Sequence, residues 1–209
     1  MTRKTEPPTL QIEGDLWRSG LSHVAGFDEA GRGALAGPVA VGAVILPADD
    51  PHLARTLVCS RDSKQMTPRQ RDLCVPIIKE TALTWSVAFA DSDEIDSLGI
   101  VAATRLAAAR ALAVLSLPPD YLLTDFRLEL PEFDISQTSL VKGDQISLSI
   151  AAASVLAKTS RDALMRELDT QYPGYGLGQN KGYGTQVHRS AMVRFGYSPI
   201  HRKSFSLKP

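Results

Sequence analysis

The sequence predicts an α/β fold in which a mixed β-sheet is flanked by helices and followed by a small helical C-terminal portion. Short apolar runs that end at turn-forming or acidic residues indicate strands, and two long stretches rich in Ala and Leu indicate helices. One of these stretches lies between two strand runs, an order that favours parallel pairing. With 209 residues, 44% of them hydrophobic, the chain can fill one core, so a single domain is expected.

Five apolar runs are predicted to form the strands. The first ends at Asp28, and a Gly-rich turn then leads into a long β-branched run that Pro47 closes. In residues 83–90 every second side chain is Trp, Val or Phe, which is the period of a strand. The other strands are expected at residues 121–125 and 138–144.

Two long helices are predicted between and after these strands. Residues 93–117 follow a group of capping residues and end at two consecutive prolines. Residues 149–168 place apolar side chains at helical spacing, and Ser149 can cap their start. After a Gly- and Tyr-rich loop, residues 185–195 are predicted to form a further short helix.

The domain organisation predicted from these elements is simple. Residues 1–22 are expected to form an N-terminal arm, either poorly ordered or a short helix, because charges and two adjacent prolines interrupt any apolar period. Residues 23–209 form the single expected domain, which includes the small C-terminal helical segment from about residue 169 onwards. Little function is expected in the arm.

Composition excludes several classes of protein. The two cysteines, Cys59 and Cys74, form no Cys-x-x-Cys pair, so they predict free thiols rather than a disulfide framework or a zinc site. No apolar stretch suits a signal peptide or a membrane span, and a soluble, cytoplasmic protein is expected. The net charge is zero, but residues 142–209 carry 10 basic against 4 acidic side chains. This asymmetry indicates a basic face suited to phosphate, although it also arises by chance.

Four acidic residues stand at the ends of predicted elements. Asp28 and Glu29 end the first strand, Asp125 ends a second, and Asp144 closes the strand before the second long helix. If these strands are neighbours, the carboxylates converge into an oxygen-rich cluster that suits Mg²⁺ or Mn²⁺. Taken singly, Asp125 and Asp144 are more simply turn or cap residues. Two adjacent acids before a Gly-rich loop are costly unless a cation offsets their repulsion.

The loop after these acids contains Gly31, Arg32 and Gly33. It offers unobstructed backbone N–H groups and one guanidinium, which together favour a phosphate or a sugar edge. Without the neighbouring acids, a glycine turn with a solvated arginine would be the simpler interpretation. The chain contains no Gly-x-x-x-x-Gly-Lys-Ser/Thr pattern, so the loop is not a nucleotide P-loop.

Several sequence blocks occur in one order from His23 to about Phe205. They are GFDEAGRGALAGPVAVGAVIL at 26–46, DSK at 62–64, YLLTD at 121–125, KGDQISLSIAAASVLAKTSRD at 142–162, KGYGT at 181–185 and HRKSF at 201–205. This ordered set strongly resembles the type 2 ribonuclease H family, ribonuclease HII. The resemblance implies a ribonuclease H-like sheet with helices packed on it and a C-terminal segment that covers substrate.

The resemblance also implies a reaction and a metal site. It implies an endonuclease of DNA replication and repair that hydrolyses the RNA strand of RNA–DNA hybrids and cuts 5′ to ribonucleotides embedded in duplex DNA. Two-metal hydrolysis with Mn²⁺ or Mg²⁺ would leave 3′-hydroxyl and 5′-phosphate ends. Asp28 would bridge both ions, Glu29 and Asp125 would complete one site, and Asp144 the other. Asp162 is the rival for the fourth position, and Asp144 is preferred because the family places that carboxylate in Lys-Gly-Asp.

Substrate contacts are implied for the glycine loop and for Tyr183. Gly31, Arg32 and Gly33 would read the sugar and backbone at an RNA-to-DNA junction, and Tyr183 would pack near the ribonucleotide and test for its 2′-OH. In isolation Tyr183 is more simply a packed loop tyrosine.

Basic residues supply further candidates for substrate contact. Lys158 and Arg161 are three residues apart on the predicted helix and either bind phosphate or only solvate that face. Contacts to the nucleic-acid backbone are also expected from Lys142, Lys181, Arg202 and Lys203.

Two residues depart from the family pattern, and three alternatives stay open. Phe126 follows Asp125 where the family has Gly, and Gly99 replaces an Asn in the helix near Ile100, where it should cost about 1 kcal/mol.

A different nuclease or transposase-like enzyme would cut plain DNA or RNA, and a non-catalytic module would only bind hybrids. Ribonuclease HIII has an extra N-terminal domain, for which residues 1–22 are too few. A monomer is expected.

Overall fold

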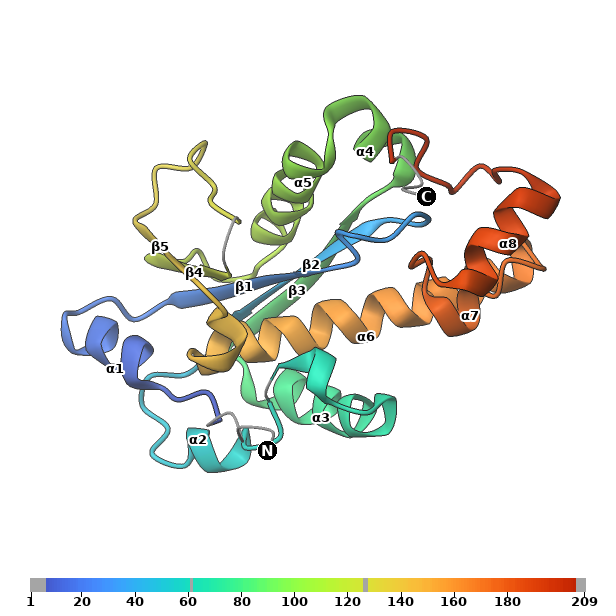
Figure 1. Ribbon diagram of the computed structural model, residues 1–209. Coiled ribbons are helices and arrows are strands. Elements are labelled where there is room, and N and C mark those ends of the chain that lie inside the picture. Colours follow the sequence, from blue (N-terminus) through green and yellow to red (C-terminus); the bar gives the residue numbers. More distant parts are fainter. Residues whose placement is uncertain (1–6, 61, 126–127, 206–209) are drawn as a thin grey trace.

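The computed structural model describes residues 7–60, 62–125 and 128–205. Its centre is a five-stranded mixed sheet in the order β3-β2-β1-β4-β5 (Figure 1). β2 is antiparallel to both of its neighbours, whereas β1, β4 and β5 run parallel to one another. The predicted α/β class and the mixed sheet are therefore confirmed. The strands are Val24–Ala30 (β1), Val39–Ile45 (β2), Thr84–Ala90 (β3), Tyr121–Asp125 (β4) and Gln137–Leu140 (β5).

The register of the sheet brings acidic residues to one edge. Phe27 of β1 lies opposite Thr124 of β4 in a parallel pair. The next residues along these strands, Asp28 and Asp125, therefore reach the same edge, because parallel strands present their carboxyl ends together.

Helices cover both faces of the sheet (Figure 1). α5 packs on β2 and β3, whereas the 24-residue α6 crosses the other face against β1 and β2, with α3 and α7 packed on it. None of the described helices has both the length and the apolar character needed to cross a membrane. The helices are Gln11–Arg18 (α1), Leu53–Thr56 (α2), Pro68–Thr81 (α3), Ser92–Leu98 (α4), Ile100–Ala113 (α5), Leu148–Gln171 (α6), Leu177–Asn180 (α7) and Gln186–Phe195 (α8).

Glycines on two strands let α6 approach the sheet closely. A Cβ atom at Gly26 would lie 2.3 Å from the carbonyl carbon of Ser149, and one at Gly42 would lie 2.4 Å from the carbonyl oxygen of Ala153. No side chain fits at either position without moving the helix. The first half of α6 is thereby fixed against the strand that carries Asp28.

The prediction of one continuous helix over residues 93–117 is wrong. Two helices, α4 and α5, meet at Gly99, whose φ of +79° lies in the region that favours glycine. Gly99 thus ends one helix and begins the next, instead of loosening a single one. The second departure from the family pattern, Phe126, lies outside the described residues.

The strand predicted at residues 138–144 is shorter than expected. β5 ends at Leu140, and Lys142 adopts a left-handed conformation with φ +58°. The Gly143 N–H then donates to Asp125 Oδ1 over 2.7 Å instead of continuing the sheet. Asp144 consequently lies in a 3-10 turn, Gly143–Gln145 (η2), and not at a strand end.

Between Pro47 and β3 the structure contains elements that were not predicted. These are α2, a 3-10 turn at Ser63–Gln65 (η1) and α3. α3 begins with a capping box in which Thr67 and Gln70 satisfy each other's backbone N–H groups. Pro76 lies inside this helix, and only three of its residues are buried, so its apolar period is weak.

The N-terminal arm contains a packed helix, the second of the two expected alternatives. Ile12, Leu16 and Trp17 of α1 pack against a small core cluster beneath the sheet. Glu13 is fully buried, and its Oε1 accepts hydrogen bonds from the N–H and hydroxyl of Ser149, at the start of α6. A carboxylate at this position offsets the positive end of the helix dipole.

The expectation of two free thiols is wrong. Cys59 and Cys74 form a disulfide, with 5.8 Å between their Cα atoms. A cysteine count carries no information about proximity, and Cys74 lies on α3, a helix that was not predicted. The bond closes the loop that carries η1.

Candidate metal centre and nucleic-acid interface

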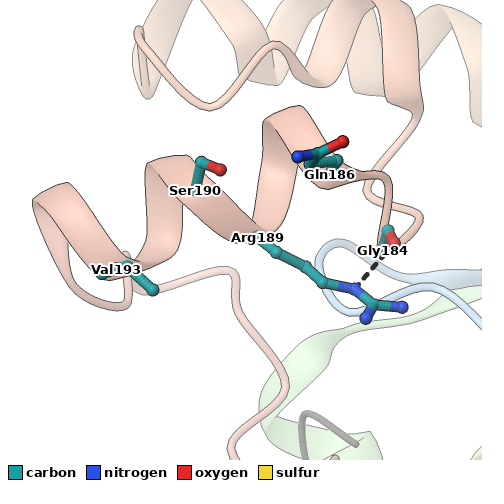
Figure 2. Close-up of a pocket in the computed structure, with 5 residues that line it drawn as sticks. All are labelled: Gly184, Gln186, Arg189, Ser190 and Val193. Carbon is teal, nitrogen blue, oxygen red and sulfur yellow. Dashed lines mark hydrogen bonds between the residues drawn. The ribbon is translucent and has the colours of Figure 1, made fainter. Parts of the chain in front are cut away.

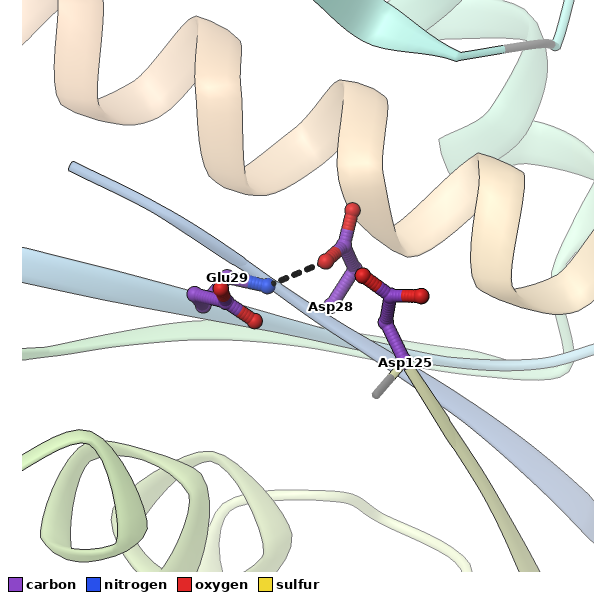
Figure 3. A group of neighbouring side chains, drawn as sticks. All are labelled: Asp28, Glu29 and Asp125. Carbon is purple, nitrogen blue, oxygen red and sulfur yellow. Dashed lines mark hydrogen bonds between the residues drawn. The ribbon is translucent and has the colours of Figure 1, made fainter. Parts of the chain in front are cut away.

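Three carboxylates converge at the edge of the sheet. One carboxylate oxygen from each of Asp28, Glu29 and Asp125 lies within 4.8 Å of the other two (Figure 3). Asp28 Oδ1 accepts the backbone N–H of Glu29 over 2.7 Å, and Asp125 Oδ1 accepts that of Gly143. Asp28 and Glu29 lie inside β1, which continues to Ala30 instead of ending at them as expected, and Asp125 is the last residue of β4. The strands thus hold the carboxylates rigidly while leaving other oxygens open.

The electrostatics of this cluster favour binding of a cation. Burial, followed by the charges of Glu29 and Asp125, raises the pKa of Asp28 well above its usual value. Burial and Asp125 likewise raise the pKa of Glu29. No described residue donates a hydrogen bond to Asp28 Oδ2 or Glu29 Oε2, although both atoms are buried. A divalent cation would relieve both the repulsion and the missing contacts, so the donor set fits a hard metal ion.

Asp144 lies beside this cluster, next to an acid that was not singled out from the sequence. Burial, followed by the charges of Asp62 and Asp125, raises the pKa of Asp144 to about 6. Asp62 is itself 9% exposed and accepts hydrogen bonds from the Lys64 N–H and from the Gln65 side chain. Asp144 belongs to the same cleft, but not to the group of three whose oxygens lie within 4.8 Å.

Lys64 is a cation that borders both parts of this cleft, and it was also missed. Partial burial opposes its charge, but the attraction of Asp28, Asp144 and other acids raises the pKa of Lys64. The motif Asp-Ser-Lys was visible in the sequence without a role. Its loop is fixed by Arg71, which donates to the Ser63 carbonyl over 2.9 Å.

Asp162, the rival for the fourth acid, is engaged elsewhere. It forms ion pairs with Arg71 at 3.1 Å and with Lys158 at 2.7 Å. It does not line the cleft that contains Asp144, so its position favours a role in holding α6 and α3 together.

The cleft consists of two adjoining hollows that share Glu29, Arg32 and Lys64. The first, of about 470 Å³, is here named the acidic hollow and is also lined by Asp62, Asp125, Val141, Lys142, Asp144 and Gln145. The second, of about 520 Å³, is named the glycine-loop hollow and is also lined by Ala30, Gly31, Gly33, Ser63, Arg71, Lys158 and Tyr183.

Two buried arginines fix the backbone of the glycine loop. Gly31 has φ +89°, and a Cβ atom there would lie 1.8 Å from Arg161 Nε. Arg202 donates from its terminal nitrogens to the carbonyls of Gly31, over 2.8 Å, and of Arg32, over 2.9 Å. The loop is thereby held open without any side chain at Gly33.

The sequence-based expectations for these two arginines are wrong. Arg161 was expected to bind phosphate or solvate its helix face, and Arg202 to contact nucleic acid, yet both are fully buried. Arg161 donates to the backbone carbonyls of Pro38, Ala36 and Lys181. Burial, followed by the charge of Arg161, lowers the pKa of Arg202 to about 9.

Tyr183 faces the glycine loop across the second hollow. Lys158 Nζ and Arg161 Cζ each lie 5.6 Å from the centre of its ring. Lys181 adopts φ +53°, and its ammonium donates to the Gly178 carbonyl. Lys142 and Lys203 are exposed, so their predicted contacts with nucleic acid stay predictions.

A third hollow, of about 560 Å³, lies on the outer face of α8. Figure 2 shows Gln186, Ser190 and Val193 along the helix, with Arg189 reaching back to Gly184. Arg189 Nε donates to the Gly184 carbonyl over 2.9 Å, so this side chain fastens the loop that carries Tyr183. No acid lines this hollow, which makes it a poor candidate for the chemistry.

Comparison with known proteins identifies the family. The family model for ribonuclease HII matches residues 25–208. The chain belongs to the ribonuclease HII family. It is 52% identical to ribonuclease HII of Synechococcus sp. (strain JA-3-3Ab), over 97% of this chain and 90% of that protein. It is 48% identical to a ribonuclease HII of Thermus thermophilus, over 93% and 91%. Membership makes the chain a ribonuclease HII, a metal-dependent endoribonuclease.

Solved structures confirm the ribonuclease H-like fold. Ribonuclease H2 from Pyrococcus horikoshii OT3 matches with a TM-score of 0.73 and 24% identity, covering 87% of this chain and 93% of that one. RNase HII from Archaeoglobus fulgidus, solved in a complex with PCNA, matches with a TM-score of 0.74 and 23% identity, covering 90% and 96%. Bst-RNase HIII in complex with Mn²⁺ gives a TM-score of 0.64 at 23% identity, covering 83% and 63%.

Proposed function

We propose that this ribonuclease HII hydrolyses the RNA strand of RNA–DNA hybrids and cuts on the 5′ side of a ribonucleotide embedded in duplex DNA. The products are 3′-hydroxyl and 5′-phosphate ends. The observation that carries the proposal is that the acidic hollow and the glycine-loop hollow share three residues. A nucleotide whose sugar occupies the glycine-loop hollow would then have its phosphate beside the carboxylates.

The acidic hollow would hold divalent Mn²⁺ or Mg²⁺, two ions when substrate is bound. Asp28, Glu29, Asp125 and Asp144 are the proposed ligands, and the buried oxygens of Asp28 and Glu29 without described donors support this choice. When bound, such ions activate water and stabilise the leaving oxygen of a phosphodiester. Glu29 lines both hollows and Asp28 is its buried neighbour on β1, which suits a central position of the pair in the site.

The remaining residues of the cleft would bind and orient the substrate. Lys64 and Arg32 border both hollows and supply positive charge for the phosphate. The backbone of Gly31 and Gly33 allows close approach of the sugar edge. Tyr183 would stack near the ribose and test its 2′-OH, which distinguishes RNA from DNA along the backbone.

Two lysines have supporting positions near this tyrosine. Lys158 is paired with Asp162 and lies over the Tyr183 ring, so it adds charge to the hollow and limits movement of the ring. Lys181 lies just before Tyr183, and burial lowers the pKa of its ammonium. We infer that both contribute positive charge along the nucleic-acid path, with smaller effects than Arg32.

Cleavage mapping tests the proposed function. The substrate is a DNA duplex with one central ribonucleotide, incubated with Mn²⁺, with Mg²⁺ or with EDTA, and the ends are mapped on a sequencing gel. A single metal-dependent cut 5′ to the ribonucleotide is expected. Equal cutting of an all-DNA duplex would instead identify a general nuclease, and binding without cutting would identify a hybrid-binding module.

The same protein and substrate test the remaining proposals. The protein is proposed to act as a cytoplasmic monomer, and light scattering with and without substrate measures its mass in solution. A Tyr183→Ala variant should lose cleavage at the single ribonucleotide selectively. An unchanged rate on that substrate would contradict the proposed role of Tyr183.

A further inference from the structure

A buried pair of histidines lies directly behind Tyr183. His188 on α8 is 0% exposed and His201 is 1% exposed, and their Nε2 atoms are 3.1 Å apart. His188 Nδ1 lies 3.0 Å from the Tyr183 carbonyl oxygen. At the other end, the N–H and hydroxyl of Ser198 lie 3.0 Å and 2.7 Å from His201 Nδ1.

The hydrogen-bond partners determine where each proton lies. The backbone N–H of Ser198 can only donate, so His201 Nδ1 is an acceptor and the proton of the neutral ring is on Nε2. His201 Nε2–H therefore donates to His188 Nε2, which leaves the proton of His188 on Nδ1. That Nδ1–H donates to the Tyr183 carbonyl, which can only accept. One tautomer of each ring satisfies the whole chain.

Both rings are neutral under ordinary conditions. Burial, followed by the charge of His188, lowers the pKa of His201 to about 4. Burial also lowers the pKa of His188. The titratable rings packed on His201 are Tyr175, in the loop before α7, at 4.8 Å between ring centres, and Tyr197, four residues earlier in the same segment, at 5.6 Å.

The same segment also holds the glycine loop. Arg202, next in sequence to His201, donates to the carbonyls of Gly31 and Arg32. Its backbone N–H donates to the Leu35 carbonyl, and the Leu35 N–H donates to the Gly182 carbonyl over 2.7 Å. Consecutive residues of one segment thus fix the two sides of the glycine-loop hollow.

We propose that His188 and His201 are positioning residues that hold Tyr183 at a fixed distance from the glycine loop, and so set how strictly a single ribonucleotide is distinguished from a deoxyribonucleotide. This inference rests on the proposed function, in which Tyr183 tests the sugar. A continuous hybrid offers a 2′-OH at every position, whereas a single ribonucleotide offers one. A displaced Tyr183 should therefore lower cleavage at a single ribonucleotide more than cleavage of a continuous hybrid.

Two amide variants at position 188 test this inference. His188→Asn keeps an N–H donor close to the position of Nδ1, toward the Tyr183 carbonyl, whereas the longer His188→Gln places its amide toward His201. We measure kcat/KM on a duplex with one ribonucleotide and on a continuous RNA–DNA hybrid of the same sequence. The ratio of interest is kcat/KM on the single-ribonucleotide duplex divided by kcat/KM on the hybrid. His188→Gln should lower this ratio about tenfold, and His188→Asn should keep it within about threefold of the wild type.

Controls separate positioning from general damage. His52→Asn changes an exposed histidine and should leave the ratio unchanged. Thermal melting of each variant is measured in parallel, because a purely structural role would make activity on both substrates follow stability. Equal ratios for the Asn and Gln variants, or failure of both to fold, would overturn the inference.

Tyr183→Ala distinguishes failure of the histidine inference from failure of the proposed role of Tyr183. If this variant lowers the ratio and the two amide variants do not differ, Tyr183 reads the sugar without help from the histidines. If Tyr183→Ala itself leaves the ratio unchanged, the proposed role of Tyr183 fails and the inference about His188 and His201 fails with it.

Discussion

The two hollows of the cleft differ in how their polar atoms are satisfied. At the acidic hollow, Glu29 and its buried neighbour Asp28 each keep an oxygen that accepts no hydrogen bond from a described residue, and the pKa of each carboxyl group is raised. In the glycine-loop hollow, the carbonyls of Gly31, Arg32 and Tyr183 all accept hydrogen bonds from buried side chains. Buried carboxylate oxygens without hydrogen-bond donors favour binding of a cation, whereas hydrogen-bonded backbone carbonyls hold the glycine loop in one conformation. Substitutions in the two hollows should therefore change activity and stability with different signs.

The largest effect is expected from Asp28→Asn. Removing one charge from the crowded acids should lower cleavage by about 10³-fold, because the site loses much of its affinity for metal. The free energy of unfolding in EDTA should rise by about 1 kcal/mol, because repulsion and the cost of burying the charge are relieved. Single-turnover cleavage and urea unfolding measure these quantities. Retained metal-dependent activity would remove Asp28 from the site.

The opposite sign is expected for Arg202→Lys. A lysine cannot donate to the carbonyls of Gly31, Arg32 and Gly37 in the geometry of the guanidinium. The free energy of unfolding should fall by about 3 to 4 kcal/mol. Arg32→Ala is the matched control, since its side chain lies at the cleft: its stability should change by less than about 0.5 kcal/mol while KM rises. Equal stability of the two variants would contradict the comparison.

The disulfide constrains the loop that borders both hollows. Cys59 and Cys74 are 15 residues apart, and the loop between them carries Lys64. Reduction, or the change Cys59→Ser, should lower the free energy of unfolding by about 3 kcal/mol. Thiol titration with and without reductant, followed by urea unfolding of each form, measures this. A Cys59→Ser/Cys74→Ser double variant should not respond to reductant, and free thiols in the protein purified without reductant would refute the bond.

The smallest effect is a pH dependence of the metal-free protein. The pKa of Asp144 is about 6 when folded and lies near its ordinary value when unfolded. Between these values the folded state binds more protons, so stability falls as pH rises from about 4 to about 6, by about 2 kcal/mol after screening by solvent. Asp144→Asn should flatten this part of the curve. Saturating Mn²⁺ at pH 7 should restore the stability of the wild type but not of the variant.

The acidic cluster was predictable because its geometry follows from local features. Asp28 and Asp125 come directly after apolar runs, and strands that are parallel neighbours present such residues at one edge. Asp62 and Lys64 were not predictable in the same way. Their loop is positioned by contacts with α6, including the bond between Ser63 and Ser154, which are 91 residues apart.

Whether a charged residue of α6 is buried was not predictable either, for the same reason. Lys158 and Arg161 are three residues apart on one helix, yet the first lines the cleft and the second is buried. The sequence shows that both carry charge, but burial depends on what packs over the helix. The loop of Pro38 and the loop of Lys181 cover Arg161 and accept its hydrogen bonds. No pattern along α6 contains that information.

The sequence by itself determined the α/β class, the strands that carry Asp28 and Asp125, and the glycine loop, because each depends on residues close together in the chain. The tertiary structure alone decided that Arg161 and Arg202 are internal supports, that the two cysteines pair, and that His188 lies behind Tyr183. Burial and partner choice arise from segments that meet only when the chain has folded, and a local pattern does not encode them.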